Sequence, residues 1–162
     1  MTTPAPSPAS SSSASPSPSV LAHIQSLPSW LVGRVAAHGR GLVADAIAPE
    51  GLKLMQHAVL AATAEYGPLA QADLGRRLAV DPKDMVVILN HLQEAGLVLR
   101  TPDPADRRKN AVTVTPEGEA VLARCATLAE AANEQLLAPL TEEERRVLLD
   151  LLRRVHDAST SF

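Results

Sequence analysis

Aromatic residues are almost absent from this sequence. The 162 residues include one Trp, one Tyr and one Phe, so aromatic side chains make up 2% of the chain. Hydrophobic residues nevertheless reach 46% of the composition, and the core must therefore be aliphatic. An aliphatic core suits packed helices better than a strand-rich sandwich, which favours aromatic and β-branched residues. The composition predicts one mostly helical globular domain.

Cysteine and long apolar runs are also scarce. The single Cys125 cannot form an intramolecular disulfide. There is no charged and then apolar leader, and no run approaches the roughly 20 apolar residues of a membrane span. These absences predict a soluble protein in a reducing, cytoplasmic setting.

No pattern in the sequence is typical of an enzyme or a metal site. The five histidines lack the short ligand spacing with Cys or carboxylates that a zinc site uses. No nucleophile with its base, no glycine-rich phosphate loop and no paired carboxylates stand in a recognisable frame. We therefore expect no enzyme, no metal and no cofactor.

The first part of the chain divides into a tail and two helices. Residues 1–19 contain only Met, Thr, Pro, Ala and Ser, which predicts a disordered tail. From residue 20, apolar residues at helical spacing predict one long helix that ends before Pro49, and then a second helix that the pair Gly67-Pro68 stops. Any bend in the long helix is expected near its glycines, which are Gly33, Gly39 and Gly41.

The next segment has the order of a helix-turn-helix. Residues 71–79 predict a short helix, and Asp81-Pro82 supplies an N-cap followed by a proline at the first helical position. The helix that starts there runs to about Ala95, and Gly96 stands where a left-handed C-cap belongs. Helix, short turn, helix and glycine stop predict a helix-turn-helix.

A hairpin and two more helices complete the chain. LVLRT at 97–101 and NAVTVT at 110–115 are short, β-branched and bounded by turns, which predicts two strands with a long polar tip between them. A helix is expected from residue 116, and Thr141 with Glu144 predicts a capping box for a last helix. The expected fold is mostly α with a small β-hairpin wing.

These residues resemble the winged-helix core of the multiple-antibiotic-resistance regulator (MarR) family of bacterial transcription factors. The resemblance covers residues 69–118, from the Leu-x-x-x-Leu helix through the Asp-Pro helix start to Thr-Val-Thr-Pro-x-Gly. It includes Leu92 through Gly96-Leu97-Val98, then Arg100, and the tip motif Asp103-Pro104-x-Asp106-Arg107-Arg108. The flanking helices fit the family by order and length.

The resemblance implies a winged helix-turn-helix DNA-binding lobe at 67–115, with dimerisation and linking helices at 20–66 and C-terminal dimerisation helices at 116–162. A homodimer would hold two lobes over a pseudo-palindromic operator in double-stranded DNA, with half-sites roughly 34 Å apart. The apolar terminal helices also favour an obligate dimer by themselves. The net charge is −3, but residues 67–115 carry seven Lys or Arg against six acids.

The second helix of the helix-turn-helix is the expected recognition helix. Burial of its apolar face would leave six side chains for the major groove: Lys83, Asp84, Val86, Val87, Asn90 and His91. The family commonly has Ser or Thr near positions 83 and 84 and often Arg near 87, so this helix departs from the pattern. Valine methyls can touch thymine, and an Asn can reach adenine or a phosphate. The alternative is that these are solvated helix positions.

The hairpin tip is the second expected DNA contact. In the matching motif the wing enters the minor groove. Carried onto this chain, the motif implies that Arg108 enters the groove and that Asp106 orients an arginine. It also implies that Arg107 and Lys109 contact the flanking phosphates. A plain solvated tip is the alternative. Arg76 and Arg77 on the preceding helix are equally well explained as ordinary surface or as phosphate contacts.

Members of the resembled family often bind small aromatic or anionic effectors between the dimer helices and the lobe. By layout, Trp30, Arg34, His38 and His57 are the candidate residues of such a pocket, against the alternative of core or solvated positions. Cys125 lies in an aliphatic stripe and is expected to be a buried, inert thiol, with redox sensing as the alternative.

The sequence therefore predicts a homodimeric, sequence-specific DNA-binding transcriptional regulator, a repressor that a small molecule releases from its operator. The alternative is a winged-helix dimer that binds ligands or proteins and has lost specific DNA binding.

Overall fold

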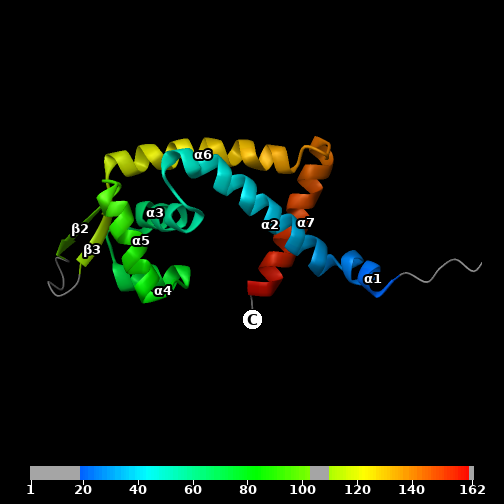
Figure 1. The fold of residues 1–162 in the computed structure, drawn as a ribbon, viewed down its shortest axis with the longest axis horizontal. Coiled ribbons are helices and arrows are strands. Elements are labelled where there is room, and N and C mark those ends of the chain that lie inside the picture. Colours follow the sequence, from blue (N-terminus) through cyan, green and yellow to red (C-terminus); the bar gives the residue numbers. More distant parts are fainter. Residues whose placement is uncertain (1–18, 103–109, 161–162) are drawn as a thin grey trace, which may run out of the picture. The chain divides into compact units, whose positions relative to one another are not determined.

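The computed structural model describes residues 19–102 and 110–160, and the chain divides into two compact units, residues 1–35 and 36–162. The helix α2 (Pro28–Ile47) runs from the first unit into the second. Figure 1 shows the elements along the chain. Within the described ranges, no helix is both long and apolar enough to cross a membrane.

The N-terminal unit corrects one prediction. Instead of one long helix there are two, α1 (Val20–Ser26) and α2, separated at Leu27. Leu27 is extended, with φ −69° and ψ 137°. The residue before a proline is disfavoured in the helical region, because the proline ring collides with its backbone. Pro28 therefore breaks the helix, whereas the three glycines lie inside an uninterrupted α2.

The C-terminal unit has the predicted order of elements. After α2 come a short 3-10 turn, η1 (Ala48–Glu50), and α3 (Leu54–Tyr66). The helix-turn-helix pair and the hairpin follow, then two long helices. They are α4 (Gln71–Leu78), α5 (Pro82–Glu94), β2 (Val98–Pro102), β3 (Asn110–Val114), α6 (Pro116–Leu136) and α7 (Glu142–Thr160).

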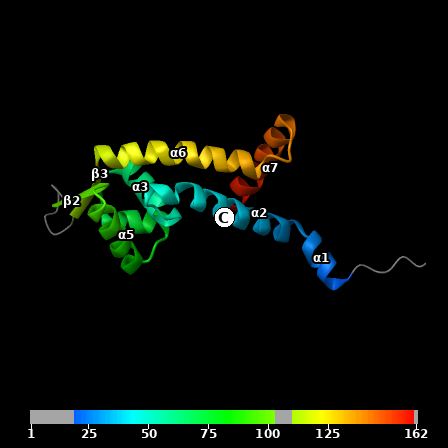
Figure 2. The same cartoon turned by 45° about the horizontal axis from the view of Figure 1, so that its top comes forward.

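The sheet has one strand more than the sequence predicts. The strand β1 (Leu69–Ala70) pairs antiparallel with β3 on the side away from β2, which gives the order β1-β3-β2. In the hairpin, Val98 faces Val114 and Pro102 faces Asn110. A strand of two residues carries no period that a sequence pattern can detect. The start of α6 lies next to this hairpin in both views (Figures 1 and 2).

The core of this unit is aliphatic, as predicted. The helix α3 packs against α4, α5, α6 and β3. Its buried side chains meet the inner faces of the helix-turn-helix, the hairpin and α6 in one cluster. The largest fully buried members include Ile47, Leu60, Leu74, Met85, Leu89, Leu92, Val98, Val112 and Cys125.

The predicted caps are present. The Asp81 side chain accepts a hydrogen bond from the backbone N of Lys83 at 2.8 Å, with Pro82 at the first helical position. Gly96 has φ +72°, in the left-handed region. The Thr141 backbone N donates to Glu144 Oε2 at 2.8 Å, and the Glu144 backbone N donates back to the Thr141 hydroxyl. The hydrogen bonds from the backbone N and the hydroxyl of Thr141 lower the pKa of Glu144.

Candidate nucleic-acid interface

The helix α5 presents one face to the core and another to solvent. Met85, Leu89 and Leu92 are buried and anchor the helix at helical spacing. The six predicted contact residues are all exposed, as the sequence analysis expected: Lys83, Asp84, Val86, Val87, Asn90 and His91. A cation, a carboxylate, two valines, an amide and an imidazole thus share one accessible helix surface. Their contact with DNA stays a prediction.

Two consecutive valines of α5 are exposed. Val86 is 42% exposed and Val87 54% exposed. Branched methyl groups at these positions can contact the methyl group of thymine in the major groove. Alternatively, they suit a protein partner. This surface is therefore compatible both with a DNA-binding regulator and with the alternative, a winged-helix dimer that binds ligands or proteins.

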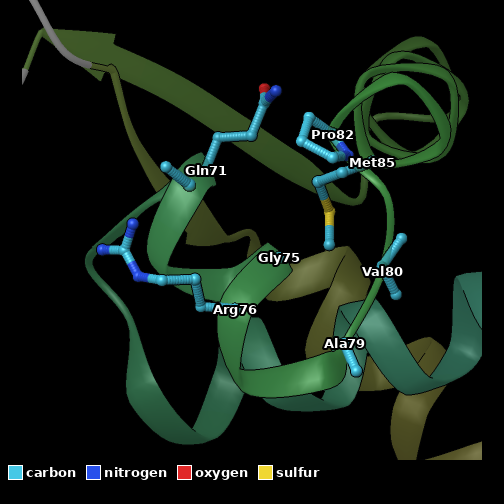
Figure 3. A pocket seen from close by; sticks show the side chains of 8 residues that line it. Gln71, Gly75, Arg76, Ala79, Val80, Pro82 and Met85 are labelled. Carbon is cyan, nitrogen blue, oxygen red and sulfur yellow. The ribbon is translucent and has the colours of Figure 1, made fainter.

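The helices α4 and α5 enclose a hollow at the start of α5. Its volume is about 410 Å³ and its walls are mostly apolar (Figure 3). Met85 extends toward Gly75 from one side, while Gln71 and Arg76 lie at the other side. Gly75 is buried, and a Cβ atom at this position would lie 3.4 Å from the Val80 carbonyl oxygen, so the turn into α5 packs closely over α4. The hollow lies next to the end of α5 that carries Lys83 and Asp84.

The two arginines of α4 both have intramolecular partners. Arg76 forms an ion pair with Asp73 one turn earlier on the same helix. The Arg77 guanidinium lies over the Tyr66 ring, 4.6 Å from its centroid. A cation over an aromatic face is attracted by the ring quadrupole. These partners favour the interpretation of ordinary helix surface, although both side chains remain exposed.

Arg100 is a residue that the sequence analysis did not single out for the site. It lies in the middle of β2 and reaches across to α5, where its Nη1 donates to Asn90 Oδ1 at 2.7 Å and to Gln93 Oε1 at 3.2 Å. Its Nη2 also approaches Gln71 Oε1, at 3.5 Å. One guanidinium therefore connects the strand that leads into the wing with both helices of the helix-turn-helix. The contacts span 7 to 29 residues of sequence, so no local pattern indicates them.

Comparison with known proteins identifies the family. Residues 50–109 match the model of the MarR family. The HTH-type transcriptional repressor Rv2887 of Mycobacterium tuberculosis is 31% identical over 126 residues, which span 78% of this chain and 91% of the repressor. The chain belongs to the MarR family. The resemblance seen in the helix-turn-helix and wing motifs is thereby confirmed.

Solved structures of this MarR-family relative have the same fold. The structure of Rv2887 in complex with DNA has a TM-score of 0.70 at 29% identity and covers 80% of this chain and 98% of that chain. The structure of Rv2887 in complex with p-aminosalicylic acid has a TM-score of 0.68 at 29% identity, with 81% and 99% covered. The mostly helical winged-helix architecture is confirmed.

The wing that the MarR resemblance assigns to DNA falls outside the described residues. This applies to Asp106, Arg107, Arg108 and Lys109. The strands that carry the tip are described, and their register runs from Val98 opposite Val114 to Pro102 opposite Asn110. The role of the four tip residues stays a prediction.

The four candidate effector residues of this MarR-family chain divide between the two units. Trp30, which is 41% exposed, and Arg34 belong to the N-terminal unit and lie on α2. His38 is exposed farther along α2, in the second unit. His57 on α3 is half-buried, and this burial lowers its pKa, so that the neutral imidazole is favoured near neutral pH. The effector pocket stays a prediction.

Cys125 is fully buried in the core cluster, as expected for an inert thiol. Burial, followed by the charge of Glu50, raises its pKa, and Arg124 acts weakly in the opposite direction. The thiolate that would react with oxidants is therefore disfavoured. Across residues 19–102 and 110–160, no group of three His, Cys, Asp or Glu side chains could hold a metal ion.

Proposed function

We propose that this MarR-family chain is a homodimeric transcriptional repressor that binds a pseudo-palindromic operator through α5 and releases it when a small aromatic or anionic effector binds. The observation that carries the proposal is α5 itself. Its core side is fixed by Met85, Leu89 and Leu92, while its outer side exposes six side chains of mixed chemistry. A rigid helix with an accessible polar face is the element that winged helix-turn-helix proteins insert into the major groove.

The relatives support DNA as the partner. Rv2887 is named a transcriptional repressor and has been solved in complex with DNA. In this chain, we assign base contacts to Lys83, Asp84, Val86, Val87, Asn90 and His91 of α5. We assign minor-groove and phosphate contacts to the wing residues Asp106, Arg107, Arg108 and Lys109. The lobe at 67–115 would be the DNA-binding part, acting in the cytoplasm and without an enzymatic role.

Exposed apolar side chains at both ends of the chain support the homodimer. In α1, in α2 and at Leu27 between them they include Val20, Leu21, Ile24, Leu27, Trp30 and Leu31, and in α7 they include Val147, Leu149, Leu151, Leu152 and Val155. Each of these is at least 39% exposed in the single chain. A large apolar surface on a monomer marks an interaction site, and a second copy of the same chain is the usual partner. We therefore assign residues 20–66 to dimerisation and linking helices and residues 116–162 to C-terminal dimerisation helices.

The effector is proposed from the ligand of the relative. Rv2887 was solved in complex with p-aminosalicylic acid, a small aromatic acid. In this chain Trp30 offers an aromatic surface, and Arg34, His38 and His57 offer polar groups for a carboxylate. Such a combination is typical of a small-molecule pocket. Binding would stabilise a spacing of the two lobes that does not match successive major grooves.

DNA binding can be tested by fluorescence anisotropy with DNA fragments that flank the gene encoding this chain. We expect Val87→Glu to weaken binding at least tenfold, because a carboxylate in the groove opposes phosphates and base acceptors. Ala64→Glu adds the same charge at an exposed position of α3 and should bind nearly as the wild type does. A salt series should show the steep loss of affinity that accompanies counterion release. The proposal fails if the protein binds no fragment specifically at moderate salt, or if both variants behave alike.

The wing is tested in the same assay. Arg108→Ala should weaken operator binding, since the proposal places this guanidinium in the minor groove of each half-site. If Arg108→Ala binds the operator as tightly as the wild-type protein does, the wing does not contact DNA as proposed, while the proposed role of α5 is unaffected.

A further inference from the structure

Arg100 lies at the centre of a cluster of three side-chain amides. Its Nη1 is 2.7 Å from Asn90 Oδ1 and 3.2 Å from Gln93 Oε1, and its Nη2 is 3.5 Å from Gln71 Oε1. Asn90 and Gln93 lie one turn apart on α5, and Gln71 is the first residue of α4. The shortest contact is therefore to Asn90, a side chain of the proposed DNA-binding face.

The chemistry of the guanidinium fixes the orientation of these amides. An arginine donates hydrogen bonds and accepts none, so any amide bonded to it must turn its oxygen inward. Rotating the Asn90 amide by half a turn would place its NH₂ group against the N–H groups of a cation. The flip would lose a charge-assisted hydrogen bond, which is stronger than a bond between neutral groups.

The surroundings of Arg100 strengthen this preference. Its Nε is buried and has no hydrogen-bond partner. Asn90, Gln93, Glu94 and Arg100 line a small hollow of about 150 Å³. Among the ion pairs of residues 19–102 and 110–160, however, none joins Arg100 to Glu94 or to another carboxylate. The positive charge therefore depends on amide oxygens, and the Asn90 NH₂ group is directed away from it, on an exposed side chain.

We propose that Arg100 is a positioning residue that fixes Asn90 as a hydrogen-bond donor only, so that Asn90 reads guanine and not adenine in the operator. This inference rests on the proposed function of α5. A freely rotating Asn reads adenine with two bonds, because adenine presents an acceptor at N7 beside a donor at its N6 amino group. Guanine presents acceptors alone, at N7 and O6, and these match an amide that offers only its NH₂ group.

Through Arg100, β2 would influence base recognition by way of α5. Arg100 reaches Asn90 from the strand that leads into the wing, and Gln71 joins the same cluster from α4. A change in this cluster alters which base α5 prefers, whereas loss of a purely structural contact would weaken binding to every sequence alike.

The test is a base-substitution scan of the operator, in which each base pair of both half-sites is replaced in turn and affinity is measured by anisotropy. Wild-type protein should prefer guanine over adenine about tenfold at one symmetry-related position. Asn90→Ala should abolish that preference. Arg100→Met, which removes the donor and keeps the length, should lose it or shift it toward adenine. Arg100→Lys, which can still donate to Asn90 Oδ1, should retain it.

Arg100→Gln serves as a second variant if Arg100→Met does not fold, since Gln can both donate and accept and so permits either amide orientation. Three results overturn the inference: an adenine preference that depends on Asn90, no base preference that depends on Asn90, or a guanine preference that survives in Arg100→Met or Arg100→Gln. If the wild-type protein bound no operator at all, the proposed function itself would be contradicted. That result differs from the three above, which contradict only the role of Arg100.

Discussion

Gly118 is the residue at which α6 packs on the loop that follows α5. A Cβ atom at this position would lie 2.3 Å from the carbonyl oxygen of Leu97 and 2.7 Å from a methyl group of Val114. The first neighbour is backbone, and it also accepts a hydrogen bond from the Thr115 backbone N, so it cannot easily move.

We expect Gly118→Ala to lower the free energy of unfolding by about 1–3 kcal/mol, the usual cost of overpacking a core. Gly41→Ala is the matched control, because that helical glycine has open space around its Cβ position. The control should raise stability by about 0.5–1 kcal/mol, the intrinsic preference of a helix for Ala. Urea unfolding measures both, and equal effects of the two substitutions would contradict the packing at Gly118.

Cys125 supports a second prediction at this scale. Because the thiol is fully buried and burial raises its pKa, a thiol reagent should label native protein only as fast as the protein opens, and unfolded protein at once. The raised pKa also sets how the contribution of Cys125 to stability changes with pH. The unfolded state loses the thiol proton first, so the contribution of Cys125 to stability falls as the pH rises above about 8.5. Rapid labelling of the native protein would support redox sensing instead.

Sequence patterns predicted single residues well where the signal is local. The buried side of α5 and the caps at Asp81 and Thr141 follow from spacing within one or two turns. Arg100 was recognised only as part of the family motif and was given no role at the site, because its partners come from two helices and the strand itself gives no sign of them. The hydrogen bond from Arg100 to Asn90 Oδ1, which leaves only the Asn90 NH₂ group for DNA, was not predicted for the same reason.

At the scale of elements, Thr115 connects three segments. Its hydroxyl accepts a hydrogen bond from the Gly118 backbone N at the start of α6 and donates one to the Gly96 carbonyl oxygen at 2.7 Å. Thr115 also directly follows β3. One side chain therefore caps α6 and holds it to the turn that ends α5.

We expect Thr115→Ala to cost about 1–2 kcal/mol of stability, as loss of an N-cap does. Thr127→Ala on the exposed surface of α6 is the control and should change stability by less than about 0.5 kcal/mol. Thermal unfolding followed by circular dichroism distinguishes them. A Thr115→Ala protein as stable as the control would show that the cap contributes little.

Two differences between expected and observed elements have separate causes. The prediction of one long first helix was wrong. Apolar residues continue at helical spacing through Leu27, but the steric effect of Pro28 on the residue before it ends the helix there. The strand β1 was missed because it contains only two residues and depends on its pairing with β3. Periodicity reports side-chain burial, and it is insensitive to local backbone exclusion and to long-range pairing.

At the scale of the whole molecule, the exposed apolar side chains of α7 predict an obligate dimer. Leu151 and Val155 lie four residues apart on one side of the helix and are 48% and 70% exposed. Replacing both with Glu places two carboxylates in the proposed interface, where they would be buried without partners.

We expect L151E together with V155E to convert a dimer into a monomer, or into protein that no longer folds, as judged by light scattering coupled to size-exclusion chromatography. Arg153→Glu on the same helix is the control and should remain dimeric, since Arg153 is exposed and polar. A wild-type chain that is a folded monomer at micromolar concentration would contradict the assignment of these helices to dimerisation.

In the proposed complex, a two-fold dimer inserts two copies of α5 into successive major grooves. Hydroxyl-radical footprinting on the DNA that flanks the gene tests it most directly. We expect two symmetry-related protected stretches with centres about 10 base pairs apart, both lost in Val87→Glu. A single unsymmetrical footprint, or a pattern that Val87→Glu leaves unchanged, would contradict it.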